Sequence, residues 1–359
     1  MSYTLFAQRR MTFVALAVFA VFNYFFPSEY AWWTWLILAM PVGHPTVESV
    51  HHDALLTNIS VGYTNPGYIA DQVFPIVNVR KQTDVIPKYD KSHFFRHAAE
   101  IRAPGAPSLR GGFKVTHTDL YHCPRFSYGF EIPDELRDNA DEPFNMDRDG
   151  TRFVTEKGYL CREGAFATDY FATSKGWTDL VGGTNFFQWS DYAASSPLTD
   201  METWKDNVEA IIGQEPKTLV LGKQAWVPTK WHPDLIDTVK YTQRGVMTTE
   251  LMASLFEVDR ILIGRAIRVT SAEGVAEGSA TYARIFGKSG LLLYVPAGPS
   301  LMTPAAGYTF VWARVPNALQ YIKRIRNEER EIDIIEMNSY FDQALIVGNA
   351  GTFLSGLVA

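Results

Sequence analysis

The stretch from Tyr63 to Tyr89 places the strongest constraint on how this chain can fold. It opens on Asn65-Pro66-Gly67, where proline fixes φ and glycine permits a positive φ, so a turn is expected there. An apolar, β-branched run from Val73 to Val79 follows and ends in Arg80-Lys81, after which alternation resumes. The pattern predicts a chain that crosses a surface, pairs as a strand and continues into a long exposed ribbon.

Two further segments extend this prediction. Val85 to Phe95 and Phe113 to Tyr128 are rich in β-formers and flank a Pro/Gly-rich segment, Arg102 to Gly112. They are expected to pair as a long two-stranded ribbon with a loop at its tip. An isolated hairpin of that length is only marginally stable in water, so it needs a neighbouring surface to pack on. This indicates an assembly.

Composition narrows the class of protein. The 359 residues suffice for one large or two modest domains, and 47% hydrophobic with 20% charged residues is typical of a folded chain. A net charge of −6 disfavours a strongly basic, DNA-wrapping face. Cys123 and Cys161 could form at most one disulfide and match no zinc pattern. We interpret them as two free, mostly buried thiols in a reducing compartment.

The first forty residues differ from the rest. An apolar run from Met11 to Phe26 follows Arg9-Arg10, and a second, Trp-rich run extends from Ala31 to Met40. Taken alone, these runs predict a signal anchor or an N-terminal membrane helix. The hypothesis that we prefer is that Met40 is the natural start and that residues 1–39 are an upstream extension, because ordinary soluble sequence follows Pro41.

Helical and extended patterns are interleaved irregularly in the remainder, which predicts an α+β fold. Gly158 and Gly164 within the longest helix predict close backbone packing or a bend. Thr199-Asp200-Met201-Glu202 is a capping-box pattern, and Gly213 closes the helix that it opens. The predicted helices are 147–171, 199–213 and 249–256, and the predicted strands are 218–221, 260–270, 291–295, 308–313 and 330–337.

Each candidate enzyme or metal-binding motif in the sequence has a better structural interpretation. Gly287-Lys288-Ser289 is interpreted as a turn, because Tyr282 stands where a phosphate-binding loop needs glycine. Asn145 to Glu156 superficially matches a calcium loop, but a helix start with acids near its positive end is the preferred interpretation. His117, His122 and Cys123 would not share one strand face, which disfavours a metal site. No catalytic, cofactor-binding or metal-ligating residue is therefore predicted, and no cofactor.

Between His44 and Leu357, the order of features resembles the Hong Kong 97-type major capsid proteins of tailed bacteriophages. Six segments carry the resemblance: NPGYIADQVFPIVNVRK (65–81), RAPG (102–105), FEIPDELRDNADEPFNMDRDGTRFVTEK (130–157), TLVLGKQAW (218–226), LMASLFEVDRILIGRAI (251–267) and SGLLLYVPAGP (289–299). Residues 1–39 depart from the family pattern.

The resemblance implies a division into parts. Residues 1–40 would be the apolar extension, 41–75 the N-terminal arm and 76–128 the extended β-hairpin loop over a neighbouring subunit. Residues 129–204 and 316–359 would form the peripheral domain with the long spine helix. Residues 205–315 would form the axial domain. Phe74, Ile76 and Val79 are expected to be buried in the shell or in the subunit core.

The implied function is self-assembly into an icosahedral shell around double-stranded DNA, in a virion assembled in the host cytoplasm. The implied partners are copies of the chain itself in pentamers and hexamers, scaffolding, portal and decoration proteins, and packaged DNA without sequence-specific contact. Neither a small-molecule substrate nor an enzymatic activity is implied. Some relatives crosslink through lysines, and nothing in the sequence selects among Lys81, Lys88 and Lys91.

Basic and aromatic residues of the loop and of the C-terminal region are the candidates for subunit contacts: Lys88, Arg96, Arg102, Arg110, Phe113, Lys323, Arg324 and Arg326. The last three, with Arg330, are interspersed with glutamates, so a solvated face is expected, with intersubunit salt bridging as the alternative. Two other functions remain open. One is an encapsulin-like shell around cargo protein, and the other is a membrane-anchored, β-rich surface protein.

Overall fold

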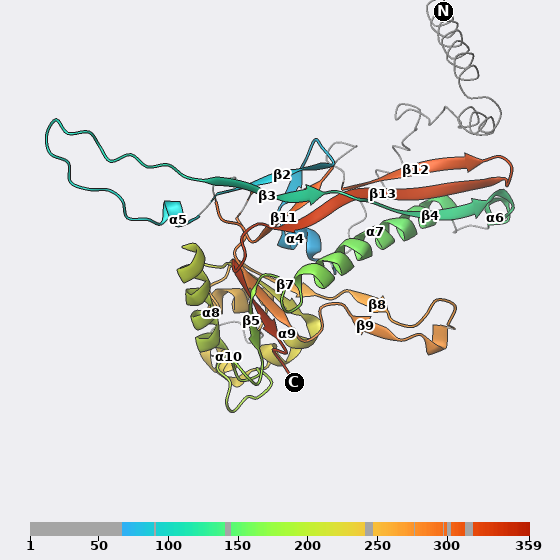
Figure 1. The fold of residues 1–359 in the computed structure, drawn as a ribbon. Helices are drawn as coiled ribbons and strands as arrows, with labels where there is room; N and C mark the ends of the chain where they lie inside the picture. The colour runs from blue at the N-terminus through green and yellow to red at the C-terminus, as the bar shows by residue number, and fades with distance from the viewer. Residues whose placement is uncertain are drawn as a thin grey trace, which may run out of the picture. The chain divides into compact units, whose positions relative to one another are not determined.

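The computed structural model describes residues 67–89, 91–140, 145–240, 247–275, 277–296, 298–299, 303–312 and 319–359 (Figure 1). The chain divides into two units, Met1–His51 and His52–Ala359, and every described residue lies in the second. The apolar runs before Met40 and most of the predicted arm lie outside the described residues, so both hypotheses on the N-terminus stay predictions. None of the helices described here has the length and apolarity needed to cross a bilayer.

Helices and strands alternate irregularly, as predicted for an α+β fold. The described helices are α4 (Ala70–Val73), α5 (Lys91–Phe94), α6 (Asp134–Asp138), α7 (Met146–Tyr170), α8 (Pro197–Ile212), α9 (Lys223–Lys230), α10 (Pro233–Val239), α11 (Thr249–Leu255) and the 3-10 turn η2 (Glu277–Ser279).

The strands group into two larger sheets and two ribbons. The long sheet has the order β1 (Ile76–Asn78), β11 (Gly307–Val311), β13 (Ile332–Leu345) and β12 (Gln320–Asn327), and β4 (Arg125–Pro133) also pairs with β13. The mixed sheet has the order β5 (Thr178–Val181), β14 (Gly351–Ser355), β10 (Gly290–Leu293), β6 (Thr218–Gly222) and β7 (Arg260–Gly264). The ribbons pair β2 (Thr83–Tyr89) with β3 (Val115–His122), and β8 (Ile267–Val269) with β9 (Tyr282–Arg284).

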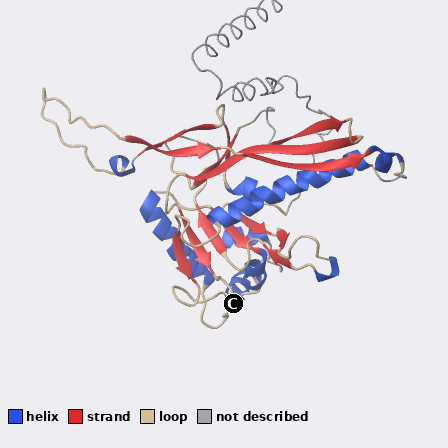
Figure 2. Ribbon diagram, turned by 45° about the vertical axis from the view of Figure 1, so that its right-hand side comes forward, coloured by secondary structure: helices blue, strands red, loops and turns tan. Residues whose placement is uncertain are grey.

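The mixed sheet is covered on both faces. Every residue of β6 and β10 is buried, as expected for a continuous apolar run between turn residues. Leu219 and Leu221 face a core that α8, α9, α10 and α11 complete. Val220 faces a second core, to which Phe166 from α7 and Phe74 contribute. Figure 2 shows these helices gathered around the mixed sheet.

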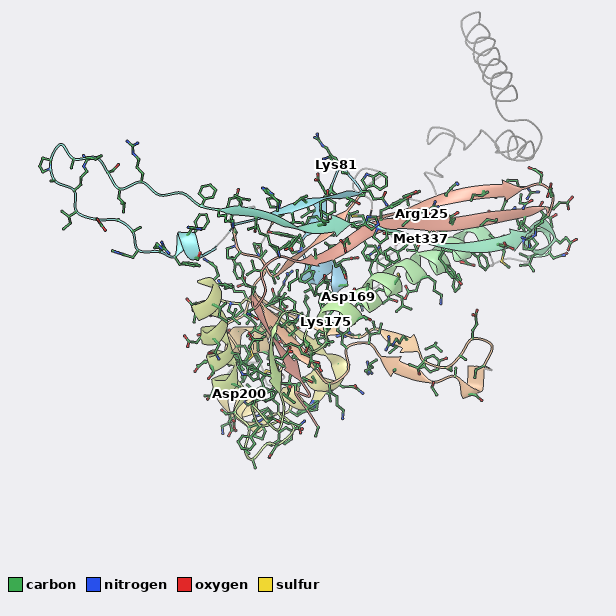
Figure 3. The ribbon with its side chains drawn as sticks, in the orientation of Figure 1. Lys81, Arg125, Asp169, Lys175, Asp200 and Met337 are labelled. Carbon is green, nitrogen blue, oxygen red and sulfur yellow. The ribbon has the colours of Figure 1, made fainter. Side chains whose placement is uncertain are left out.

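Helix α7 links this sheet to the long sheet. Asn145 caps its start by accepting a hydrogen bond from the Arg148 backbone N–H at 2.9 Å, and two aspartates occupy its first turn. Its first half packs on the long sheet through Val154, close to Ile335 and Met337. A Cβ at Gly158 would lie 2.6 Å from Met337, so the predicted close packing at Gly158 is confirmed. Figure 3 labels Met337. At Gly164 a Cβ would meet nothing within 4 Å, so the prediction of close packing there is wrong, and the alternative of a bend stays a prediction.

The ribbon of β2 and β3 confirms the pairing predicted around Val85, but not its length. The predicted first flank ends in α5 instead of continuing as a strand to Phe95. The second flank breaks at Cys123, and the chain then enters β4 in the long sheet. Ile76 belongs to β1, which pairs in parallel with β11, and so lies in the long sheet.

Other local predictions need correction. The strand predicted for 260–270 is two strands, β7 and β8, in different sheets. Helix α8 begins at Pro197 with Ser196 as its N-cap, so Thr199 and Glu202 lie inside the helix and form no capping box. Gly213 does close α8, with φ +68°. Cys123 is buried and free as expected, whereas Cys161 is free but exposed.

Candidate assembly surfaces

The loop between β2 and β3 is the most exposed part of the described chain. Its described side chains from Ser92 to Lys114 are exposed, apart from a half-buried Ala106. They include large apolar residues, namely Phe94, Phe95, Ile101, Leu109 and Phe113. Such residues lack a core within the subunit, and clustered exposed apolar side chains mark interaction surfaces.

An aromatic group organises the base of this loop. The ring centroid of Phe113 lies 5.6 Å from that of Tyr89 and 5.9 Å from that of Phe94. The ring of Phe95 lies against Gly213 at the end of α8, where a Cβ would come within 2.8 Å of it. The loop is thus held at its base and exposed beyond it.

The basic candidates in this region fall into two groups. Arg96, Arg102 and Arg110 are exposed, and none forms an ion pair within the described residues. Lys88 contacts Asp119 across the ribbon, and its Nζ lies 3.5 Å from the carbonyl oxygen of Leu345 in β13. Lys88 therefore fastens the ribbon to the long sheet.

A buried carboxylate anchors the segment that leads into β1. Glu163 of α7 is fully buried and accepts hydrogen bonds from the backbone N–H groups of Ile69 at 3.0 Å and Ala70 at 2.8 Å. These groups open α4, so one side chain satisfies donors at the start of that helix. Phe74 then packs edge-on against Phe166, 5.4 Å between centroids.

Burial raises the pKa of Glu163 to about 7, although the two backbone N–H donors act in the opposite direction. Its neighbour Arg162 is also buried, and its Nε lies 3.1 Å from an oxygen of Asp71. Arg162 stacks over Tyr159, with 4.7 Å between its guanidinium carbon and the ring centroid. Sequence reasoning missed this pair. The available signal was a charged dipeptide within a helix that carries apolar residues on more than one side.

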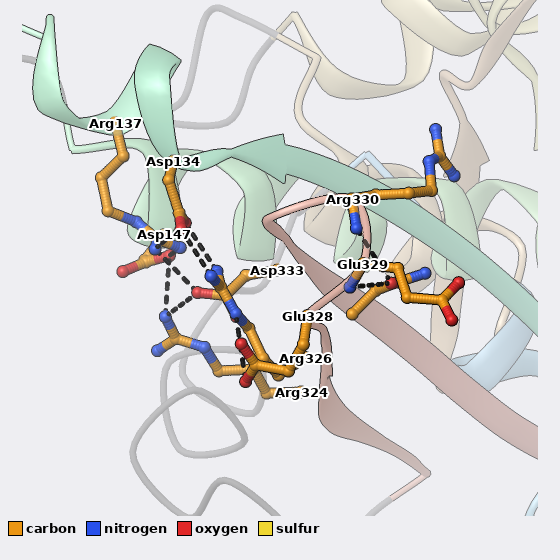
Figure 4. A network of polar contacts seen from close by, with 10 residues as sticks. Asp134, Arg137, Asp147, Arg324, Arg326, Glu328, Glu329, Arg330 and Asp333 are labelled. Atoms are coloured by element: carbon orange, nitrogen blue, oxygen red, sulfur yellow. Dashed lines mark hydrogen bonds and ion pairs between the residues drawn. The ribbon is translucent and has the colours of Figure 1, made fainter.

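Two of the three C-terminal basic candidates, Arg324 and Arg326, lie in a polar network at the far end of the long sheet (Figure 4). Arg324 and Arg137 contact one oxygen of Asp333 at 2.6 Å and 2.7 Å. Arg326 forms a bidentate pair with Asp134 at 2.6 Å and 2.5 Å. Burial works against ionisation of Asp333, but the hydrogen bonds from Arg324 and Arg137 outweigh it, and the pKa of Asp333 is lowered.

Arg324, Arg326 and Arg330 are exposed, as expected for a solvated face, and the network adds ion pairs within the chain to that face. Arg324 and Arg326 belong to β12, a strand that the sequence analysis missed, and their charges are balanced within the chain. Lys323 is half-buried and forms no ion pair among the described residues. A role of these residues in subunit contacts stays a prediction.

The calcium interpretation of Asn145 to Glu156 is wrong, because Met146 onward is helical and Asn145 is its cap. Glu156 instead accepts a hydrogen bond from Tyr68. The preferred helix-start interpretation is confirmed. His122 contacts Thr83 across the ribbon at 2.7 Å, and within the described ranges no group of three metal-ligating side chains occurs.

One polar pair resembles a catalytic dyad. Buried Ser195 and His232 are joined by a 2.9 Å contact between Oγ and Nε2. However, His232 Nδ1 accepts the backbone N–H of Asp234 at 3.2 Å, so the neutral ring carries its proton on Nε2 and donates to Ser195. Burial lowers the pKa of His232. The histidine thus caps α10 and cannot take a proton from Ser195.

Comparison with known proteins agrees with this architecture. No protein-family model matches the chain. The major capsid protein of Burkholderia phage BcepMu is 29% identical over 315 residues, which cover 85% of this chain and 96% of that protein.

Two solved structures are similar in fold. A phage-related protein from Bordetella bronchiseptica has a TM-score of 0.65 and 24% identity, covering 86% of this chain and 98% of that chain. The mature capsid of bacteriophage PhiM1 has a TM-score of 0.50 and 9% identity, covering 82% and 88%. The chain is therefore similar over most of its length to the major capsid protein of a tailed bacteriophage, and it has the Hong Kong 97-type fold.

Proposed function

We propose that this chain is the subunit of an icosahedral shell that encloses double-stranded DNA. Similarity to a phage major capsid protein over nearly that protein's whole length supports shell formation and a structural, non-enzymatic role. The hydrogen bond that His232 donates to Ser195 is consistent with that role.

The single observation that carries the proposal is the loop between β2 and β3. Five large apolar side chains lie exposed in the loop that joins the two strands of this ribbon. Burying apolar area contributes on the order of 25 cal/mol per Å² before association costs are subtracted. A neighbouring copy is the surface on which this loop would lie, and pentamers and hexamers are the proposed arrangements.

The division into domains is also a proposal. The long sheet with α7 would be the peripheral domain, and the mixed sheet would be the axial domain. On this view the axial domain is larger than 205–315, because β5 and β14 pair within its sheet. Scaffolding, portal and decoration proteins are proposed partners, and the net charge of −6 suits a shell that does not hold DNA tightly.

The test is to express the full chain and examine it by negative-stain microscopy and sedimentation, with and without replacement of residues 96–110 by a Gly/Ser linker. The wild-type chain should form shells or capsomer rings, and the loop variant should remain a folded subunit. Nuclease-protected DNA in particles from phage-producing cells would separate a virion shell from one that holds protein cargo.

The loop variant's circular dichroism and unfolding midpoint serve as its folding control. A wild-type chain that stays a monodisperse monomer under all assembly conditions would contradict the proposed function. Shells formed equally well without the loop would show that another surface carries assembly.

A further inference from the structure

The mixed sheet ends in two edges of opposite chemistry. One edge is β7, which is followed by the β8–β9 ribbon, and the other is β5, near which α8 packs. The β8–β9 ribbon and α8 lie on opposite sides of the sheet in both views (Figures 1 and 2). The two edges can therefore face two different neighbours.

The β7 edge is basic and apolar. Arg265 and Arg284 are exposed, and both act electrostatically on half-buried Lys223 at the start of α9. Within the described residues, neither arginine makes an ion pair or a hydrogen bond through its side chain. Like charges gathered in this way repel one another unless an anion joins them.

Apolar side chains share this ribbon with the arginines. The register pairs Ile267 with Arg284 and Val269 with Tyr282, so these four residues lie on one face of the ribbon. Ile267, Val269 and Tyr282 are each more than half exposed. A surface that mixes β-branched residues with arginines suits a protein partner better than a phosphate backbone, which has no use for the apolar part.

The opposite edge carries the complementary character. Glu202, Asp206 and Glu209 of α8 are exposed at a spacing of four and then three residues, which places them in one stripe on the helix. None forms an ion pair among the described residues. The one basic residue of α8, Lys205, is buried and pairs with Glu215 at 2.6 Å.

Apolar residues accompany the acidic stripe as well. Phe186 packs on Trp204 of α8, 5.1 Å between ring centroids, and bridges to Gly182 at the end of β5. Its neighbour Phe187 is 62% exposed and Val181 is 43% exposed. The β5 edge therefore exposes apolar groups, and the adjacent helix α8 presents its acidic stripe on the side that faces away from Trp204.

We infer that the β7 edge of one copy, through Arg265, Arg284 and the apolar face of the β8–β9 ribbon, docks on the β5 edge and α8 of the next copy. The partner is a second copy of this chain because this chain itself carries both complementary surfaces. Since the two surfaces differ, the contact is head to tail, and repetition closes into a ring. The inference rests on the proposed shell function and assigns residues to one of its contacts.

Charge reversal tests the pairing. The first variant is Arg265→Glu/Arg284→Glu, and the second is Glu202→Lys/Asp206→Lys/Glu209→Lys. Each variant alone brings like charges together at every ring contact, so association should weaken about tenfold or more. Neither variant should form rings or shells in sedimentation and negative-stain microscopy.

An equal mixture of the two variants restores opposite charges at every contact when the copies alternate around a ring. Alternation suits a ring of six and fails in a ring of five, so the mixture should give six-membered rings, sheets or tubes and few closed shells. Because the mixture contains the same two chains that fail separately, each variant is the control for the other.

Shells from either variant alone at wild-type yield would overturn the inference, and so would a mixture that does not assemble. Failure of the wild-type chain to assemble would instead count against the proposed function.

A photoreactive phenylalanine analogue at Tyr282 in the otherwise unaltered chain gives an independent readout that does not depend on charge reversal. Crosslinked peptides should contain residues 181–187 or 202–209 of a neighbouring copy. Crosslinks found only at other segments would overturn the pairing.

Discussion

The mixed sheet and the β2–β3 ribbon use apolar residues in opposite ways. In the mixed sheet, β6 and β10 are buried along their whole length and both faces are covered. In the ribbon, Ile86 of β2 and Tyr121 of β3 are buried, whereas Leu120 of β3 is 63% exposed. We infer from this difference that the mixed sheet stabilises the subunit, whereas the exposed apolar side chains of the ribbon contribute once another copy covers them.

A matched pair of leucines gives the largest expected contrast. Leu221→Ala in β6 removes a fully buried side chain and should lower the free energy of unfolding by about 2–5 kcal/mol in urea titrations. Leu120→Ala should change it by less than about 0.5 kcal/mol and should instead reduce the yield of assembled particles. Equal destabilisation by the two substitutions would contradict the contrast between the mixed sheet and the ribbon.

The pH dependence of unfolding tests the contact between Glu163 of α7 and the segment that leads into β1. The pKa of Glu163 is raised to about 7 in the folded chain, from 4.5, so the folded state binds the proton more tightly than the unfolded state. Its stabilising contribution is fully present below about pH 4.5 and is lost as the pH rises through about 7.

Glu163→Gln removes this titration, so its free energy of unfolding relative to wild type should improve by up to about 3 kcal/mol as the pH rises from 4.5 to above 7. Urea unfolding of both proteins across this pH range is the measurement. A difference that does not vary with pH would mean that the carboxyl group does not titrate there.

Two glycines of α7 give a smaller contrast between a covered and an open side of one helix. Gly158→Ala would press a Cβ against Met337 and should destabilise the subunit by about 1–3 kcal/mol. Gly164→Ala meets open space and should stabilise it by about 0.5–1 kcal/mol through helix propensity. The measurement is the thermal unfolding midpoint of both variants. Midpoints that shift in the same direction would contradict the packing of Gly158 against Met337.

Sequence patterns predicted what local chemistry determines. The helix at 147–171 and the buried strand at 218–221 follow from apolar spacing and from flanking polar residues, and both are confirmed. Of the three residues expected to be buried, Phe74 is fully buried, whereas Ile76 and Val79 are half-buried within the subunit. Whether the shell covers the remainder stays a prediction.

The missed features depend on partners that lie far away in the sequence. In the sequence, β12 is a run of charged residues with no strand pattern. The carboxylate that balances Arg326 belongs to Asp134, which lies 192 residues away. The burial of Glu163 depends on the backbone of Ile69, 94 residues away. Neither pairing leaves a periodic signal, because the balancing group belongs to a different element.

Helix α7 contributes to the core of the long sheet at its first half and to that of the mixed sheet at its second half. Its 25 residues form a rod of roughly 37 Å at about 1.5 Å per residue. Such a rod acts as a lever, because a tilt of about 5° at one end displaces the other by about 3 Å at that length. A change of curvature imposed on the long sheet would therefore reach the mixed sheet as a displacement, so the two halves of the subunit must adjust together.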